Sequence, residues 1–284
     1  MKLATFTHDG TTRLGVVEGT EVVDLGTTVP RDMLAFLEAG PSALATARAA
    51  RGPRLPLDAV RLEAPIRRPP KFLAVGLNYA DHVAESGMQT PTHPMIFNKQ
   101  STCVVGPTDD VHVPRVSEMV DYEGELGVVI GRRCRHVSRA DAPGVIAGYL
   151  VVDDVSARDW QFHTATWTMG KSFDTHGPIG PWIVTPDELP DPHRLEIRTW
   201  VNGELRQHSN TRHLIFDCFA LVEYLSAAFT LEAGDVITTG TPSGIGIGMQ
   251  PPRLLAAGDV VSVEIESVGR LDNRMVPEPT EVPA

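Results

Sequence analysis

The 284-residue sequence predicts an α+β fold that is mostly β, in which a small N-terminal α/β domain (residues 1–68) precedes a larger domain (residues 69–284). The chain has 25 glycines and 23 prolines, a content that favours many turns. Beyond residue 70 the apolar runs are short and separated by turn residues, and a single stretch has the length of a long helix. The larger domain is therefore expected to be a closed or rolled sheet with few helices, and not a βαβ array.

The N-terminal domain is predicted to begin with a hairpin and two short helices. Strand-like runs at 14–18 and 21–25 flank a Gly-Thr pair, which is typical of a tight turn. A helix with three apolar residues on one face follows and is predicted to end at Gly40. A second short helix is predicted over 43–50.

Five prolines mark the predicted domain boundary. They stand at positions 53, 56, 65, 69 and 70. Proline is disfavoured inside helices and in central strands, so this segment suits a connection between two folded units. The boundary is accordingly placed at residue 68.

The larger domain is predicted to contain seven strands and one long helix. Strands are expected at the apolar runs 72–75, 126–130, 149–152, 182–184, 195–201, 236–239 and 260–265. Asn202-Gly203 predicts a type I′ hairpin turn, because both central positions of that turn need a positive φ. The helix is predicted over 215–229, with an apolar face made of Phe219, Val222, Leu225 and Phe229.

The charged residues are distributed unevenly along the chain. The net charge is −11, and residues 69–284 contain 16 basic and 28 acidic side chains. An acidic body repels phosphate backbones, so we expect no nucleic-acid partner. A solvated acidic surface would account for most of these charges, although the composition also suits carboxylates gathered around a hard cation.

The sequence indicates a cytoplasmic protein with no membrane partner. The longest apolar stretch, 145–152, is too short to span a bilayer. The first residues lack the apolar core of a secretory signal. Cys103, Cys134 and Cys218 are odd in number and far apart, so they predict neither a disulfide framework nor a zinc motif.

The sharpest chemical signal is a pair of acids, Glu123 and Glu125, directly before and within an apolar run. In a strand, residues two apart point to the same face, so these carboxylates would project together. A third acid, Asp154, follows the run 149–152. Adjacent buried carboxylates repel each other, and a bound Mg²⁺, Mn²⁺ or Ca²⁺ would remove that conflict. Glu-x-Glu alone is more often a solvated strand edge, but the apolar flanks favour burial here.

A second signal is His82 with Glu85 three residues later, on a predicted helix for which Asn78 is a plausible N-cap. A carboxylate beside an imidazole orients the ring and raises its basicity, as a water-activating base requires. On the spacing alone, an exposed pair on a surface helix is the commoner outcome.

Two cations and a glycine-rich segment complete the candidate site. Arg158 and Lys171 would suit an anionic substrate or a developing oxyanion, or would simply balance neighbouring acids. Segment 239–248 carries Thr241 among several glycines, but it fits neither the dinucleotide-binding nor the Walker spacing. A substrate-lining loop whose backbone amides and Thr241 approach the ligand is the better interpretation.

Several motifs in order resemble the fumarylacetoacetate hydrolase family over roughly residues 70–280. They are Gly-Leu-Asn-Tyr-Ala-Asp-His (76–82), Tyr-Glu-Gly-Glu-Leu (122–126), Asp-Asp-Val-Ser-Ala-Arg-Asp (153–159), Gly-Lys-Ser-Phe-Asp (170–174) and Thr-Gly-Thr-Pro-Ser-Gly (239–244). Residues 1–68 are similar to the small extra domain of the longer bacterial members. The resemblance implies a mixed β-roll body and a homodimer.

The same resemblance implies a role for each matching residue. The metal ligands would be Glu123, Glu125 and Asp154, the catalytic residues His82, Glu85 and Lys171, and the substrate-binding residues Arg158, Gln161 and Thr241. The cofactor would be Mg²⁺ or Mn²⁺, with Ca²⁺ as a further option. Two positions depart from the family pattern: Asp153 stands where many members have Asn, and His176 where Phe is frequent.

The expected function is metal-dependent hydrolysis of a carbon–carbon bond in a 1,3-diketo acid, such as an acylpyruvate or a diketo sugar acid. The cation would stabilise the departing enolate, and His82 would activate the attacking water. Lys171 and Gln161 would stabilise the oxyanion, while Arg158 would hold the substrate carboxylate. Decarboxylation of an oxaloacetate-like acid and keto–enol isomerisation use the same enolate chemistry and stay open. A non-catalytic ligand-binding module is the alternative of another class.

Overall fold

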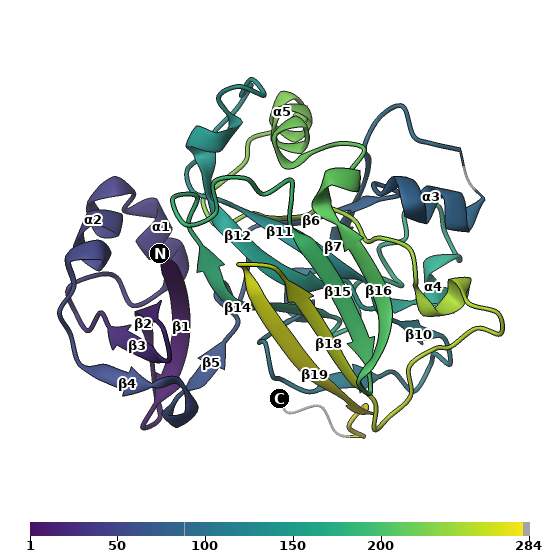
Figure 1. Cartoon of the computed structure of the whole chain (residues 1–284), viewed down its shortest axis with the longest axis horizontal. Helices are drawn as coiled ribbons and strands as arrows, with labels where there is room; N and C mark the ends of the chain where they lie inside the picture. Colours follow the sequence, from purple (N-terminus) through teal and green to yellow (C-terminus); the bar gives the residue numbers. More distant parts are fainter. Residues whose placement is uncertain (88, 281–284) are drawn as a thin grey trace.

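The structure, a computed structural model, describes residues 1–87 and 89–280. Figure 1 shows a small N-terminal unit beside a larger body. The unit has five strands, β1 (Lys2–His8), β2 (Thr11–Glu18), β3 (Glu21–Asp24), β4 (Arg54–Pro56) and β5 (Arg61–Glu63), and two helices, α1 (Met33–Glu38) and α2 (Pro41–Ala49). β2 and β3 pair antiparallel across the turn at residues 19–20. The predicted hairpin and both predicted helices are therefore confirmed.

The largest sheet runs from the N-terminal unit into the body. β1 pairs with β14 (Gly177–Val184), with Lys2 opposite Val184. The sheet continues through β12 (Ile146–Asp153), β11 (Gly124–Ile130), β17 (Val236–Thr238), β6 (Phe72–Gly76) and β7 (Met95–Lys99), with β8 (Val104–Val105) beside β14. Backbone hydrogen bonds thus join the two units, and the domain boundary at residue 68 stays a prediction.

A second, five-stranded sheet packs against the body part of the first. Its strands follow the order β16 (Glu204–Asn210), β15 (Glu196–Val201), β18 (Val260–Ile265), β19 (Gly269–Pro277) and β9 (Val111–Val113). A two-stranded ribbon joins β10 (Val120–Asp121) to β13 (Ser156–Ala157). Most strand pairs in the described residues are antiparallel, and the parallel ones are β6–β17, β8–β14 and β9–β19. The seven predicted strands and the mostly β fold class are confirmed.

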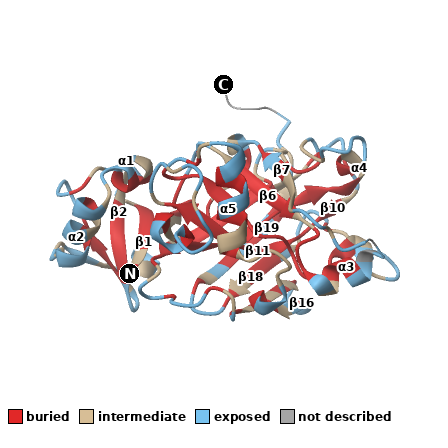
Figure 2. Ribbon diagram, turned by 90° about the horizontal axis from the view of Figure 1, so that it is seen from above, coloured by how far each residue is buried: buried red, intermediate tan, exposed pale blue. Residues whose placement is uncertain are grey.

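β11 and β12 are buried on both faces. Because side chains alternate along a strand, Val128 and Val151 pack between the two sheets and α5 (Cys218–Ala228). Val129 and Val152 point the other way, into a cluster shared with the N-terminal unit. Figure 2 shows the buried strands in red beneath exposed loops and helices. This double burial fixes the strand ends from which the acids of the candidate site project.

The long helix was predicted over 215–229, but α5 is shorter and presents a different face. It begins after Asp217, whose carboxylate caps the first turn by accepting backbone N–H groups. Its buried side chains are Cys218, Leu221, Val222, Leu225 and Ser226. Phe229 follows the helix in extended backbone and is 36% exposed, so it lies off the helical face.

The turn between β15 and β16 confirms the predicted type I′ geometry. Asn202 has φ +52° and Gly203 has φ +79°, so both central residues are left-handed. In the described part of the chain, no helix is long and apolar enough to cross a membrane.

Candidate metal centre and active site

Three buried acids meet at one end of the β11–β12 pair. Glu123 directly precedes β11, Glu125 lies within it, and Asp154 directly follows β12. Gly124 lies opposite Asp153 in the antiparallel register, so these strand ends are neighbours. One carboxylate oxygen from each of Glu123, Glu125 and Asp154 lies within 4.8 Å of the others. The structure therefore brings the three predicted metal ligands together.

Two lysines hold the carboxylates of this triad. Lys171 Nζ donates to Glu123 Oε2 and Asp154 Oδ2, each at 2.8 Å. Lys99, at the end of β7, donates from Nζ to Asp154 Oδ1 at 2.6 Å and also bonds the backbone carbonyl of Lys171. Asp154 thus has a cation on each oxygen, whereas Lys171 bridges two of the three acids.

Arg158 is the third cation, at the start of α4 (Arg158–Gln161). Its Nη1 donates to Glu123 Oε1 at 2.5 Å and to Gln161 Oε1 at 2.9 Å, and its Nε donates to Asp121 Oδ2 at 2.9 Å. Its guanidinium is buried. Two carboxylates therefore fix the orientation of Arg158.

The buried charges at this site do not balance. The site contains five buried carboxylates and three buried cations, which are Asp121, Glu123, Glu125, Asp153 and Asp154 against Lys99, Arg158 and Lys171. The surplus of two negative charges matches the charge of one divalent cation. Carboxylate oxygens are also the ligands that Mg²⁺, Mn²⁺ and Ca²⁺ prefer. The residues present therefore fit a hard divalent cation.

The pKa values show how the surplus charge is accommodated. Burial, reinforced by the neighbouring acids, raises the pKa of Glu125 well above its ordinary value. Burial also raises the pKa of Asp153 to about 7. Glu123 differs, because Lys171 and Arg158 overcome the effect of burial and lower its pKa to about 2. The acids without a cation partner hold protons more tightly, as a site built for additional positive charge would.

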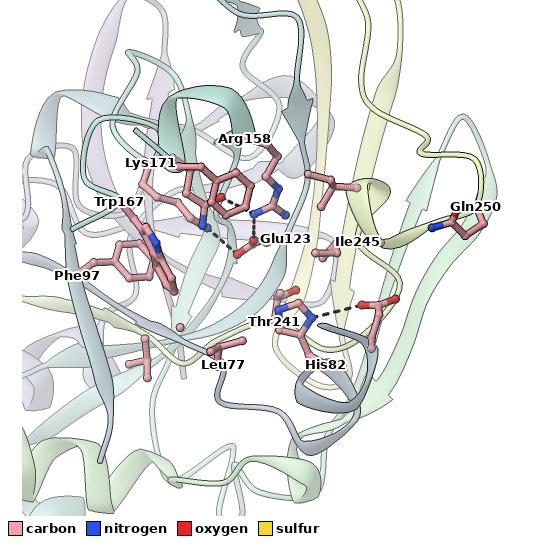
Figure 3. A pocket seen from close by; sticks show the side chains of 17 residues that line it. Leu77, His82, Phe97, Glu123, Arg158, Trp167, Lys171, Thr241, Ile245 and Gln250 are labelled. Atoms are coloured by element: carbon pink, nitrogen blue, oxygen red, sulfur yellow. Dashed lines mark hydrogen bonds and ion pairs between the residues drawn. The ribbon is translucent and has the colours of Figure 1, made fainter. Parts of the chain in front are cut away.

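The predicted His–Glu dyad lies on α3 (Ala80–Ser86). His82 Nδ1 is 3.3 Å from Glu85 Oε2, and the backbone N–H of Gly244 donates to the other oxygen of Glu85 at 2.9 Å. Glu85 therefore fixes the ring of His82 from the Nδ1 side, so that Nε2 is the ring nitrogen away from this contact. Figure 3 shows His82 on one side of Glu123, with Lys171 and Arg158 on the other.

The predicted helix cap at Asn78 is wrong. Tyr79 occupies the N-cap position of α3 without a side-chain cap. The Asn78 side chain instead donates to the carbonyls of Phe216 and Thr239 and accepts the N–H of Phe216. It is fully buried, so these backbone partners compete successfully with the cap. Asn78 thus ties the segment before α3 to the end of β17.

The glycine-rich loop after β17 uses its amides differently from the prediction. Four of its backbone N–H groups bind carboxylates of the site: Gly240 to Glu125, Gly244 to Glu85, and Gly246 and Ile247 to Asp121. A Cβ on Gly244 would lie 2.1 Å from the carbonyl oxygen of Arg206, and Gly244 has φ +99°, so glycine is required there. The loop positions protein acids, and these amides are not available to a ligand.

Gln207, on β16, fixes the Glu-x-Glu backbone and Thr241 together. Its Oε1 accepts the N–H of Gly124 at 3.0 Å, and its Nε2 donates to Thr241 Oγ1 at 2.8 Å and to the Pro242 carbonyl. Thr241 in turn donates to the carbonyl of Gly124 at 3.0 Å. The hydroxyl proton of Thr241 is therefore committed, and the oxygen offers a ligand only an acceptor.

One cavity of about 390 Å³ joins these groups. Seven of the nine predicted site residues line it, namely His82, Glu85, Glu123, Arg158, Gln161, Lys171 and Thr241. The other two, Glu125 and Asp154, do not line the cavity, but they are next to Glu123 in the triad and are 1% and 0% exposed. The structure thus gathers all nine residues, whatever their roles, around one pocket.

Sequence reasoning missed Asp121, Lys99 and Gln207. Asp121 stands two residues before Glu123, and that spacing was a usable signal for a third acid on the same face. Lys99 ends a strand, where a buried lysine implies a carboxylate partner. Gln207 gave no signal, since its partners come from β11 and the glycine-rich loop.

The family model for the fumarylacetoacetate (FAA) hydrolase C-terminal domain matches residues 71–276. The chain belongs to the fumarylacetoacetate hydrolase family. A second model, Rv2993c-like, N-terminal, matches residues 1–65 of this family member.

Relatives of this family member differ in their named activities. Oxaloacetate tautomerase Fahd2a, mitochondrial, of Rattus norvegicus is 44% identical over 91% of this chain and 85% of that protein. Fumarylacetoacetate hydrolase of the psychrophilic Exiguobacterium antarcticum has a TM-score of 0.88 at 38% identity. Maleylpyruvate hydrolase of Sphingobium sp. SYK-6, in complex with manganese(II) ion and pyruvate, has a TM-score of 0.83 at 34% identity. Both structural comparisons cover 98% of this chain and 100% of the other.

Proposed function

We propose that this protein is a divalent-metal-dependent hydrolase that cleaves a carbon–carbon bond in a 1,3-diketo acid. One observation carries the proposal: a buried carboxylate triad, in a site where buried carboxylates outnumber buried cations by two, adjoins the cavity that contains a His–Glu dyad. The triad provides the ligands for a hard cation, and the dyad provides a base for water. Each group alone is compatible with a structural role, but hydrolysis by this route needs both in one pocket.

In the proposed reaction Glu123, Glu125 and Asp154 hold Mg²⁺ or Mn²⁺. The bound cation supplies Lewis acidity, which lowers the energy of the enolate that leaves. Glu85 orients His82, and Nε2 of His82 takes a proton from a water molecule. The water oxygen bonds to the distal carbonyl carbon, the carbon–carbon bond breaks, and its electron pair passes into the enolate. Protonation of the enolate then gives a 2-oxo acid beside the released carboxylic acid.

The cations of the cavity are assigned to the reacting end of the substrate. Arg158 binds the carboxylate next to the keto group, and Lys171 with Gln161 stabilises the oxyanion formed by water attack. Lys171 reaches the substrate once Glu123 and Asp154 have turned to the metal instead of its ammonium group. Thr241 accepts a hydrogen bond from the substrate, because its own proton is committed to Gly124.

A second candidate is tautomerisation of oxaloacetate, which the 44% identical rat relative favours by its name. That reaction needs proton transfer at carbon and no attack by water, and His82 would serve as the base. Decarboxylation passes through the same enolate. The products separate these reactions: hydrolysis gives two acids, tautomerisation preserves the mass, and decarboxylation releases CO₂.

The decisive experiment is a product assay with acylpyruvates and oxaloacetate in the presence of Mg²⁺ or Mn²⁺. We expect two acid fragments from acylpyruvates, and no turnover by the Glu123→Ala/Glu125→Ala double variant. Activity of that variant without metal would refute the proposed mechanism. Binding of acylpyruvates with no chemical change would favour the non-catalytic module.

Assembly and location are also proposed from family resemblance. We propose a cytoplasmic homodimer. Sedimentation equilibrium tests the dimer, and a mass of 30.8 kDa in solution would contradict it.

A further inference from the structure

One wall of the cavity is apolar and largely aromatic. It is formed by Leu77, Phe97 and Trp167, and the first two are 7% and 6% exposed. The Phe97 and Trp167 rings meet edge to face with their centroids 5.6 Å apart. Figure 3 shows Phe97 and Trp167 together beside Lys171, on the side of the cavity away from Gln250, with Leu77 below them. None of these three side chains has a role in the proposed chemistry.

The backbone is shaped to present this wall. Leu77 and Trp167 have φ of +54° and +60°, a left-handed conformation that bulky residues rarely adopt. A Cβ on Gly76 would lie 2.4 Å from the indole of Trp167, so the absence of a side chain at Gly76 makes room for that ring. Unfavourable backbone at two lining residues persists only where the surrounding structure enforces it, and it concentrates at binding sites.

The cations that line the cavity in the described residues all have carboxylate partners. His82 pairs with Glu85 and Arg158 with Asp121, while Lys171 bridges two acids of the triad. Arg158 and Lys171 also serve the reacting end of the substrate in the proposed function. No lining cation is therefore left for a second carboxylate at the far end of a ligand.

Lys171 fixes the direction in which a substrate extends. Its Nζ lies 5.1 Å from the centroid of the Phe97 ring. The acyl substituent of a substrate whose distal carbonyl is next to Lys171 can therefore lie against Phe97 and Trp167. Moving an apolar group from water to such a surface is favourable. Moving an unpaired carboxylate there is strongly unfavourable.

We propose that the acyl group of the substrate is uncharged and apolar, an alkyl or aryl chain that lies on the Leu77–Phe97–Trp167 wall. The inference rests on the proposed function for the reacting 1,3-diketo acid end. It excludes acylpyruvates that carry a terminal carboxylate as preferred substrates. It also disfavours oxaloacetate, which has no substituent to contact the wall.

A matched substrate pair tests the inference. Succinylpyruvate ends in a carboxylate, and 4-methylpentanoylpyruvate has an isopropyl group of equal heavy-atom count in its place. With the Mn²⁺-loaded enzyme we expect kcat/KM to be about 10- to 100-fold higher for 4-methylpentanoylpyruvate. Equal values, or a preference for succinylpyruvate, would overturn the inference.

Variants at Trp167 test the wall itself. In Trp167→Arg a cation replaces the indole, and we expect the ratio of kcat/KM values to move at least about 10-fold toward succinylpyruvate. Trp167→Phe is the matched control, since it keeps an aromatic ring and the same left-handed backbone requirement, and it should retain the original preference. If the ratio of the two kcat/KM values is unchanged in Trp167→Arg, Trp167 takes no part in substrate recognition.

Binding to the Mn²⁺-loaded His82→Ala variant separates this inference from the proposed function. Calorimetry with the same two compounds measures recognition without turnover. Absence of cleavage by the wild-type enzyme contradicts the hydrolase, yet tighter binding of 4-methylpentanoylpyruvate would still support the apolar wall. Tighter binding of succinylpyruvate, or no binding of either compound at millimolar concentration, would contradict it.

Discussion

The ammonium nitrogen of Lys171 lies 2.8 Å from Oε2 of Glu123, inside the carboxylate triad. The same nitrogen lies 2.8 Å from Asp154. Lys171 thus provides positive charge where a divalent cation would bind, and a lysine ammonium and a metal ion compete for the same oxygens. The competition makes the affinity of the triad for metal depend on Lys171.

Lys171→Met should therefore raise Mn²⁺ affinity, by about tenfold, while abolishing turnover. Loss of the ammonium group leaves one more uncompensated negative charge in the triad, and a change of about 1.4 kcal/mol in binding free energy corresponds to that factor. Without metal the variant should unfold at lower temperature, because Glu123 loses a buried partner. Calorimetry measures the affinity, and Lys2→Met is the control. Weaker Mn²⁺ binding by Lys171→Met would contradict this competition and show that Lys171 helps the triad to bind the metal.

Gln207→Leu should lower both stability and metal affinity. The variant keeps the volume near that of glutamine but leaves the buried N–H of Gly124 and the Thr241 oxygen without their partner. An unsatisfied buried group costs about 1–3 kcal/mol, measurable by urea unfolding. Gln250→Leu removes an amide at the edge of the same cavity and serves as control. Equal stability of both variants would mean that Gln207 has no positioning role.

Gly244→Ala should disconnect the glycine-rich loop from the dyad. The added Cβ would lie 2.1 Å from the backbone oxygen of Arg206, so the loop must shift and the N–H bond to Glu85 is lost. We expect kcat to fall by about 100-fold, because a misplaced catalytic group loses that much rate. Gly10→Ala is matched, with φ +69° and nothing within 4 Å of an added Cβ. An equal fall in kcat in both variants would mean that the strained left-handed backbone, and not the clash with Arg206, causes the loss.

The burial of His176 predicts that the folded protein is less stable in mild acid than at neutral pH. Burial lowers its pKa to about 3, and its Nε2 lies 2.9 Å from the backbone oxygen of His112. The unfolded chain binds this proton near pH 6.5, so between pH 6.5 and 3 unfolding takes up a proton. The free energy of unfolding therefore falls as the pH is lowered through this range.

His176→Phe should remove that contribution. Between pH 7 and 5 the free energy of unfolding should fall by about 2 kcal/mol less in the variant than in the wild type. Urea unfolding at the two pH values measures the difference, and other titrating groups, such as Asp153, cancel in the comparison. The same pH dependence in both proteins would contradict the buried neutral state of His176.

The strands and their turns were predictable because their causes are local. Alternation and apolar runs identified β11, β12 and β18, and Asn202-Gly203 identified a hairpin through the φ values that those two residues tolerate. The limits of α5 were less predictable. Asp217 caps the helix later than the apolar pattern suggested, and Phe229 follows it in extended backbone.

The sequence by itself determined which candidate side chains stand next to one another, because the Glu-x-Glu pair and the His82–Glu85 spacing are local patterns with direct geometric consequences. The tertiary structure alone decided which groups surround them. Asp121, Lys99 and Gln207 reach the site from separate strands, and the amides of the glycine-rich loop are bound to acids of the site. Partners of this kind depend on how distant strand ends converge, and so does the burial of five carboxylates beside three cations. No single stretch of the sequence shows which distant strand ends will come together.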